Sequence, residues 1–342
     1  MIILKLYKHV LIAFSLICLF NSCESKKAYQ ISGKTMGTTY HITVISSHQL
    51  DTDSFKNKVD SILQQVNMEM STWIPESDIS RFNRLQSTEP VKIPDDFYLV
   101  VQTANDVSEM TNGAFDITVS PLIELWGFGR GRQPKTEISK KRLDSISQFI
   151  GYKKIELLGN NHIRKTDPRV TINLSAIAKG FGVDKIADFI SSFYSTNYLV
   201  EIGGEIVVSG LNANADKWQL GIVRPEADLI MNSQVQNIVA LSNQAMATSG
   251  DYMNFYEMNG KRYSHTIDPS TLKPITHQLA SVSVIAKTCM LADAIATGLD
   301  VMGRKRAMDW IASHTDYQIY LIERENGKYN EFYSSGFRRL LP

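Results

Sequence analysis

Two-residue turns built from glycine and asparagine constrain the fold of this chain more than any other feature. They are Gly203-Gly204, Asn259-Gly260 and Asn326-Gly327, and strand-like segments flank each of them. Such pairs favour the positive φ angles of tight hairpins, although Gly203-Gly204 is equally typical of a β-bulge. Hairpins join antiparallel strands, so the second half of the chain is predicted to form a mainly antiparallel sheet.

Helical and strand-like patterns alternate along the chain without the regular winding of a parallel α/β protein. Apolar residues recur at helical spacing over 54–70, 95–110 and from Ile177 to Phe193, and a further helix is expected over 304–313. Strands are expected over 40–46, 198–202, 205–208, 218–223, 238–241 and 279–286, with hairpins over 253–267 and 317–333. No internal repeat or long linker follows residue 30. These patterns predict an α+β fold, a single compact domain with a central mainly antiparallel sheet and flanking helices.

The N-terminal segment has the pattern of a bacterial lipoprotein signal peptide over residues 1–22. Lys5 and Lys8 precede an apolar run from Val10 to Phe20, which is short for a membrane span. A small residue, Ser22, then precedes Cys23, the predicted lipidated N-terminus of the mature protein. Residues 23–30 would form a tether and residues 31–338 the folded domain. The alternatives are processing at Cys18, which follows a bulky isoleucine, and an uncleaved transmembrane anchor.

Cysteine usage and charge exclude several classes of protein. If Cys18 is removed and Cys23 is acylated, only Cys289 remains, so no intrachain disulfide can form. The formal net charge is +1, and loss of the two signal-peptide lysines leaves about −1, which gives no reason to expect nucleic acid. The seven histidines and the late cysteine form no zinc-like cluster.

One apolar helical segment carries a pair of oxygen ligands. Asp293 and Thr297 are four residues apart and lie on one helix face, so a carboxylate and a hydroxyl point into one small volume. Such hard oxygen ligands suit Mg²⁺, which is usually held by few protein groups and completed by substrate phosphates. The same pair is also common on exposed helices that bind no metal.

Five further segments combine glycine, a polar residue and an aromatic residue. They are 35–39 (TMGTT), 70–73 with 80–83 (MSTW, SRFN), 113–118 continuing to 129 (GAFDIT to LWGFG), 173–180 (NLSAIAKG), and 249–252 with 264–269 (SGDY, SHTIDP). Taken singly, each is explained by turns or core packing. Together with the Asp293/Thr297 segment, and in this order, they resemble the FAD:protein FMN transferases, the ApbE family of flavin-handling lipoproteins. The resemblance covers roughly residues 30 to 338 and implies an ApbE-like, T-fold-like architecture.

The resemblance also implies a set of site residues. The positions expected to contact FAD are Met36, Trp73, Ala114, Phe115, Asp116, Asn173, Lys179 and Ile267. The backbone carbonyl of Ala176 would join Asp293 and Thr297 in holding Mg²⁺. This chain departs from many relatives at Asn173, where they carry aspartate, and at Ala296, where some carry an acidic residue. Ala296 supplies no side-chain oxygen, so the metal would have few protein ligands.

The implied reaction moves FMN from FAD to a threonine hydroxyl of an acceptor flavoprotein and releases AMP. Catalysis of this kind depends on positioning and on neutralising phosphate charge. His265 is predicted to remove the hydroxyl proton or to orient the acceptor, because imidazole titrates near neutral pH. A hairpin histidine bonded to backbone is the structural alternative. Asp251 is a second candidate for acid–base chemistry or acceptor positioning.

Two other functions fit the same residues. An FAD pyrophosphatase would use the same metal with water as the attacking group, and a non-catalytic lipoprotein would store or deliver FAD. In each case we expect an exported protein, lipid-anchored to a bacterial membrane and facing the periplasm. The expected partners are FAD and the flavoprotein subunits of membrane or exported redox proteins, without nucleic acid.

Overall fold

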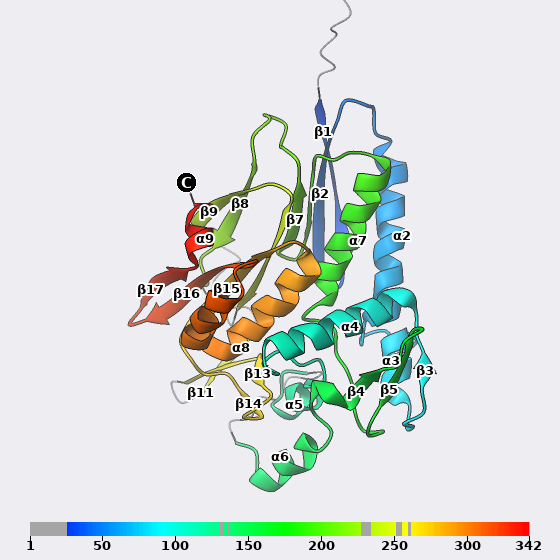
Figure 1. Ribbon diagram of the computed structural model, residues 1–342, viewed down its shortest axis with the longest axis vertical. Coiled ribbons are helices and arrows are strands. Elements are labelled where there is room, and N and C mark those ends of the chain that lie inside the picture. The colour runs from blue at the N-terminus through cyan, green and yellow to red at the C-terminus, as the bar shows by residue number, and fades with distance from the viewer. Residues whose placement is uncertain are drawn as a thin grey trace, which may run out of the picture.

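An eight-stranded antiparallel sheet forms the centre of the computed structural model (Figure 1). The structure describes residues 26–341 except 130, 132, 134, 136, 227–233, 251–254 and 259–260. In spatial order the strands are β1 (Lys27–Thr35), β2 (Thr38–Ser46), β6 (Tyr198–Ile202), β7 (Glu205–Ser209), β10 (Gln244–Gly250), β15 (Leu279–Ala286), β16 (Gln318–Glu325) and β17 (Lys328–Tyr333). The predicted α+β fold with a central antiparallel sheet is therefore confirmed.

Helices surround this sheet, and the shorter strands among the described residues pair with one another in four small separate sheets. The helices are α2 (Thr52–Met70), α3 (Asp78–Arg84), α4 (Asp95–Met110), α5 (Ser120–Leu125), α6 (Lys140–Ser147), α7 (Ala178–Phe193), α8 (Cys289–Ser313) and α9 (Ser335–Arg338). The short strands are β3 (Val91–Lys92), β4 (Ile155–Leu157), β5 (His162–Lys165), β8 (Trp218–Val223), β9 (Val235–Leu241), β11 (Phe255–Met258), β12 (Lys261–Ser264), β13 (Ile267–Asp268) and β14 (Lys273–Pro274). No helix in the described part of the chain is both long and apolar enough to cross a membrane.

The predicted hairpins are present where the structure describes their turns. Gly203 and Gly204 (φ 60° and 102°) join β6 to β7, and Asn326 and Gly327 (φ 50° and 76°) join β16 to β17. Positive φ at both turn residues matches the twist of the paired strands. Strands β11 and β12 are also paired antiparallel, but the Asn259-Gly260 turn between them lies outside the described residues.

Strand β1 was not predicted from the sequence. It pairs with β2 through a tight turn at Met36 and Gly37, with φ angles of 49° and 76°. The strand begins at Lys27 and thus contains the last residues of the segment expected to be a tether, 23–30. Its side chains alternate between partly buried and exposed, as expected of a sheet edge.

The two faces of the sheet are covered by different layers. Helices α2 and α7 pack on the β2–β6 side through a cluster that includes Phe55, Leu63 and Ile186, and α8 packs along β10 and β15. The β8–β9 hairpin and α9 cover the other face, around Trp218 and Phe337. The core thus lies on both sides of one sheet, and α7 and α8 lie side by side on it (Figure 1).

Helices α7 and α8 cap each other's N-termini, and this arrangement fixes the position of the site described below. The Asp184 carboxylate on α7 accepts hydrogen bonds from the backbone N–H groups of Cys289 and Met290, both at 2.8 Å. Asp293 on α8 accepts a hydrogen bond from the N–H of Gly180 at 3.0 Å. Carboxylates satisfy the unpaired N–H groups of a helix N-terminus and interact favourably with its dipole. Two such reciprocal caps hold the helices in one register.

Helix α8 contains both helices predicted for this region. Gly303, with φ of 72°, is non-helical and separates the segment carrying Asp293 and Thr297 from the segment 304–313. Arg306 donates hydrogen bonds to the carbonyls of Val301 and Met302 at 3.0 and 2.8 Å, so it satisfies backbone groups that the break leaves unpaired.

Candidate functional site

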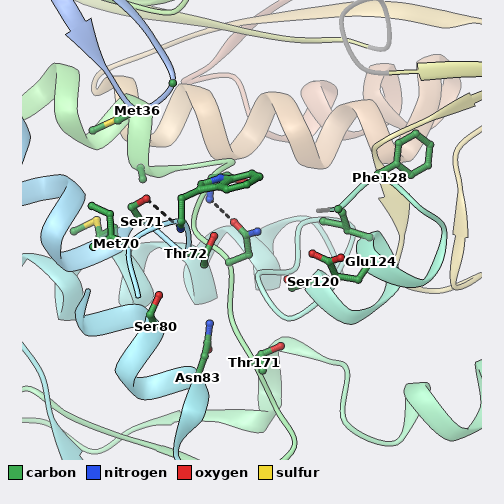
Figure 2. A pocket seen from close by; sticks show the side chains of 18 of the residues that line it. Met36, Met70, Ser71, Thr72, Ser80, Asn83, Ser120, Glu124, Phe128 and Thr171 are labelled. Atoms are coloured by element: carbon green, nitrogen blue, oxygen red, sulfur yellow. Dashed lines mark hydrogen bonds between the residues drawn. The ribbon is translucent and has the colours of Figure 1, made fainter. Parts of the chain in front are cut away.

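A cavity of about 980 Å³ lies where the β1–β2 turn, the end of α2, the start of α7 and the β12–β13 connection meet. Its lining comes from five stretches of the chain: Met36–Gly37; Val66–Asn67, Met70–Pro75, Ser80 and Asn83–Arg84; Ser120–Glu124 in part and Gly127–Gly129; Thr171–Lys179 in part; and Phe255, Tyr256 and His265. Figure 2 shows Met36, Met70 and Ser71 on one side of the cavity and Ser120, Glu124 and Phe128 on the other. Its volume is at the upper end of the range for small-molecule sites, as a large ligand requires.

Five of the predicted FAD or catalytic residues line this cavity together. They are Met36, Trp73, Asn173, Lys179 and His265, which come from separate parts of the chain. Trp73 is 71% exposed, which is unusual for a tryptophan outside a binding surface. Met36 owes its place to the β1–β2 turn, where its φ is positive. An exposed indole and a flexible thioether at one cavity suit a planar aromatic ring.

Asparagine side chains shape the polar wall between α3 and α7. The Asn83 amide bonds both backbone groups of Ile172, at 2.8 Å each, and so holds the 171–173 segment extended beside the cavity. The Asn173 side-chain oxygen accepts a hydrogen bond from the N–H of Ser175 at 2.9 Å. Asn173 thus makes a local turn before α7, which an aspartate carboxylate would make equally well.

Lys179 begins a buried group of charges at the start of α7. Its ammonium pairs with Glu205, whose side chain is 3% exposed. Burial and, to a smaller extent, the neighbouring charge of Asp293 raise the pKa of Glu205 to about 8, although Lys179 acts to lower it. Burial opposes the charge on Lys179, but Asp293 and Glu205 hold its pKa above the usual value. Burial also raises the pKa of Asp293.

This group of charges fits a bound cation. One lysine faces two carboxylates, so the cluster lacks one positive charge whenever both acids are ionised. The Glu205 Oε2 atom is buried and has no hydrogen-bond partner among the described residues. A cation beside Asp293 would restore the balance, because buried charges are tolerated when they are paired or bind metal.

The other two predicted Mg²⁺ ligands, Thr297 and Ala176, lie on α8 and just before α7, the two helices that Asp293 joins. Thr297, one helical turn further along α8, shares a hydrogen bond with Ser249 at 3.0 Å between the two hydroxyl oxygens. Ala176 lies four residues before Gly180, whose N–H bonds Asp293. Within the described part of the chain, no three His, Cys, Asp or Glu side chains are arranged to hold a metal ion. A metal here would therefore use hydroxyl and carbonyl oxygens beside the one carboxylate, which is acceptable for Mg²⁺ but not for zinc.

Four predicted FAD positions do not line the cavity, and neither do the predicted metal ligands Ala176, Asp293 and Thr297. Phe115 is buried in the core, and Asp116 accepts hydrogen bonds from the N–H and hydroxyl of Thr118 and from the N–H of Tyr152. Ala114 borders a second, smaller cavity of about 370 Å³. Ile267 is buried in a cluster with Trp126 and Leu122. Asp116 thus organises the connection after α4, and any flavin contact by these residues stays a prediction.

The two predicted catalytic residues have different outcomes. His265 lies between β12 and β13, is half-buried and lines the cavity. Asp251 lies outside the described residues.

Ala296, where some relatives are expected to carry an acidic residue, is fully buried in the core. Its methyl group packs there and supplies no metal ligand.

Some residues of the site were not singled out by the sequence analysis. Glu205 is the ion-pair partner of Lys179. Its position directly after the Gly203-Gly204 turn is the only sequence feature that could have marked it as a site residue. Ser249 belongs to the segment 249–252, but the sequence pattern assigns it no role. Glu124 and Tyr256 line the cavity, and no local pattern marked them.

Comparisons with known proteins agree with this geometry. The model of the ApbE family matches residues 36–321. The FAD:protein FMN transferase of Vibrio cholerae is 40% identical over 97% of this chain and 98% of its own length. That of Haemophilus influenzae is 38% identical over 96% of both chains. Among solved structures, the flavin transferase ApbE from Vibrio cholerae has a TM-score of 0.83 at 38% identity, covering 92% of this chain and 100% of that one. The apo form of the Pseudomonas stutzeri flavinyl transferase ApbE also has a TM-score of 0.83, at 30% identity over 92% and 97% of the two chains.

Proposed function

This chain belongs to the ApbE family and is a FAD:protein FMN transferase, and we propose that it depends on Mg²⁺ and modifies a threonine of its acceptor. The observation that carries the proposal is the cavity whose wall contains both the exposed Trp73 and Lys179, which is paired with the buried Glu205 behind it. FAD needs a surface for its flavin ring and positive charge for its pyrophosphate. The cavity offers both within one space.

In the proposed reaction the acceptor threonine oxygen bonds to the phosphorus of the FMN half of FAD. The bond from that phosphorus to the bridging oxygen breaks, and AMP leaves with the oxygen. The hydroxyl proton passes to a base, for which His265 is our candidate because it lines the cavity. Lys179 neutralises phosphate charge, and its pairing with Glu205 fixes its position. No water is consumed, which separates transfer from hydrolysis.

We assign Mg²⁺ to Asp293, Thr297 and the carbonyl of Ala176. When bound, the ion would act as a Lewis acid on phosphate oxygens. Asp293 is the only carboxylate among these three ligands, and burial disfavours its ionised form. Ala296 adds no side-chain oxygen. Metal affinity should therefore be low until FAD supplies its own phosphate oxygens.

We also propose that the protein is exported and anchored by a lipid on Cys23, facing the periplasm. The support is the sequence pattern of residues 1–23, which lie outside the described residues. The acceptors would then be flavoprotein subunits of membrane or exported redox proteins.

A direct assay tests the proposed function against its closest alternative. The purified protein is mixed with FAD, Mg²⁺ and a candidate acceptor, and the acceptor is examined for flavin fluorescence after denaturing electrophoresis. We expect a fluorescent acceptor band that disappears with EDTA. In the absence of acceptor we expect little FMN and AMP. Rapid release of both without acceptor would instead identify an FAD pyrophosphatase.

Replacing Trp73 by alanine should weaken FAD binding without affecting folding. Loss of one aromatic stacking partner costs about 1–3 kcal/mol, which is roughly 5- to 150-fold in the dissociation constant. The melting temperature should stay unchanged because the side chain is 71% exposed. Titration of flavin fluorescence measures the binding, with Trp73→Phe expected to retain most of it. Equal affinity of Trp73→Ala and the parent protein would remove Trp73 from the flavin site.

Replacing His265 by glutamine should lower kcat by about 10²–10⁴-fold if the imidazole is the base. FAD affinity should change little, because charge neutralisation belongs to Lys179. The rate of transfer is measured against pH, and the limb that reports imidazole ionisation should vanish in the variant. A raised KM for the acceptor with unchanged kcat would show that His265 only orients the acceptor.

A further inference from the structure

An exposed aromatic group lies at the C-terminal end of α7, the end farther from the cavity. Phe193, the last residue of α7, is 74% exposed, and the next residue, Tyr194, is 36% exposed. The Tyr194 ring packs edge-on against Phe55 at 4.9 Å and lies 5.3 Å from Phe189, between ring centroids. Large side chains held by such contacts yet left in water are typical of interaction surfaces.

Hydrogen bonds join this group to the place where the described chain begins. After Tyr194, the Ser195 hydroxyl donates to the carbonyl of Ile45 at 2.6 Å, and the N–H of Ile45 donates to the carbonyl of Asn197 at 2.8 Å. Ile45 pairs with Ala28 in the β1–β2 hairpin. The start of β1 and the end of α7 are therefore neighbours, at the top of Figure 1.

A third exposed apolar side chain, Leu211, belongs to the same end. Its N–H donates to the side-chain oxygen of Asn197 at 2.9 Å, and 39% of its surface is exposed. We call Phe193, Tyr194 and Leu211 the apolar end of the molecule. The charges near it are mixed, with Lys26 and Lys27 at the chain start and Asp51 and Asp53 at the start of α2.

Three elements run from this end to the cavity. Helix α2 begins at Thr52 beside the apolar end and reaches the cavity at Met70, and its 19 residues span about 28 Å at 1.5 Å per residue. Helix α7 runs back from Lys179 in the cavity wall to Phe193. Strand β1 ends at Thr35, next to the cavity residue Met36. The apolar end and the cavity thus lie at opposite ends of α2 and α7, whose ribbons can be followed in Figure 1.

We propose that the apolar end rests on the lipid surface to which the chain is anchored, with the flavin cavity facing away from the membrane. Only three residues separate Cys23 from β1, so a lipid on Cys23 would hold this end close to the bilayer. Exposed Phe, Tyr and Leu side chains enter the interfacial region of a bilayer favourably. Because the nearby charges are mixed, apolar contact and not attraction to anionic lipid drives the docking.

This orientation restricts the acceptor proteins. The cavity would stand about 25–30 Å above the membrane surface, the length of α2. An acceptor must therefore present its threonine at that height, on the part of a membrane protein that extends into the periplasm, or be a separate exported protein. The inference rests on the proposed anchor at Cys23 and is independent of the transfer chemistry.

Hydrogen–deuterium exchange on tethered protein tests the proposal. The chain from residue 23 onward is coupled through Cys23 to a maleimide lipid in phosphatidylcholine vesicles. The other cysteine, Cys289, is buried, so coupling occurs at Cys23. Relative to the same protein free in solution, we expect slower exchange on the vesicles at residues 193–197 and 210–214, and no change at residues 71–76 of the cavity wall. The slowing should be the same at low and high salt, because apolar contact causes it. Unchanged exchange at the apolar end, or equal slowing at both ends, would overturn the proposal.

A variant and a matched control complete the test. Replacing Phe193 and Leu211 by serine should abolish the slower exchange, whereas Leu158→Ser, at another exposed apolar residue outside the apolar end, should preserve it. Flavin transfer to a soluble acceptor should stay unchanged in both. If the parent protein shows slower exchange at the apolar end but no flavin transfer, the result counts against the proposed function alone. If it transfers flavin but shows no slower exchange on the vesicles, the result counts against the orientation alone.

Discussion

Replacing Asp293 by asparagine should lower flavin transfer by about 10²–10³-fold, the cost of removing one preorganised electrostatic group. The amide keeps the size of the carboxylate and can still accept the hydrogen bond from Gly180 N–H, so the α7–α8 junction is preserved. It loses one of the two carboxylate charges near Lys179, and the only carboxylate in the proposed set of metal ligands. Mg²⁺ binding in the presence of FAD, measured by calorimetry, should be lost together with transfer.

The Asp293→Asn substitution should not lower the stability of the folded protein, although it lowers flavin transfer. Burial raises the pKa of the Asp293 carboxyl, which means that the ionised form is costly in the folded protein. The melting temperature of Asp293→Asn should thus equal or exceed that of the parent in metal-free buffer, as is common for residues kept for function. Asp188→Asn, an exposed position on α7, is the matched control and should change neither property. Transfer within about threefold of the parent would remove Asp293 from the metal site.

Replacing Gly180 by alanine should reduce the free energy of unfolding by about 3 kcal/mol, the upper range for overpacking. A Cβ at this position would lie 2.4 Å from the carbonyl oxygen of Cys289 and 2.8 Å from the Cα of Met290. Both are backbone atoms of α8, so the two helices would have to separate. The intrinsic preference of a helix for alanine, about 1 kcal/mol, offsets only part of this cost.

Gly182→Ala is the matched control on the same helix. Its Cβ would meet the Met36 methyl group at 2.9 Å, the mobile end of a flexible side chain that can move into the cavity. Its stability should lie within about 1 kcal/mol of the parent. Urea denaturation measures both variants, and equal stability of the two would show that α7 and α8 are not held at the distance described. Because Gly180 N–H bonds Asp293, Gly180→Ala should also lose transfer.

Local patterns predicted most of the secondary structure because their causes are local. The turns at Gly203-Gly204 and Asn326-Gly327 need positive φ, which few residue types adopt easily. The periodicity of α2 and α7 reflects one face packed toward the sheet, and that of α4 reflects a face packed on α8 and α2. Strand β1 was missed because it lies at the sheet edge, where no strand needs a continuous apolar face.

The candidate site was only partly predictable because tertiary pairing creates it. Segments with glycine and an aromatic residue pointed to Met36, Trp73, Lys179 and His265, and the structure brings all four to one cavity. The contact of Lys179 with Glu205 depends on how α7 lies across β7, which no local pattern encodes. The resemblance to a family named Asp116, but the bonds of this side chain to Thr118 and Tyr152 show a structural task that sequence could not separate from binding.

The mass of the acceptor and the yield of AMP test the central claim most directly. After incubation with FAD and Mg²⁺, the acceptor should gain the mass of one FMN less one water, located on a threonine by peptide fragmentation. One AMP should be released for each modified acceptor, because the threonine hydroxyl and not water takes the FMN group. AMP release with an unmodified acceptor, or release that is unaffected by omitting the acceptor, would contradict the assignment of FMN transfer to this cavity.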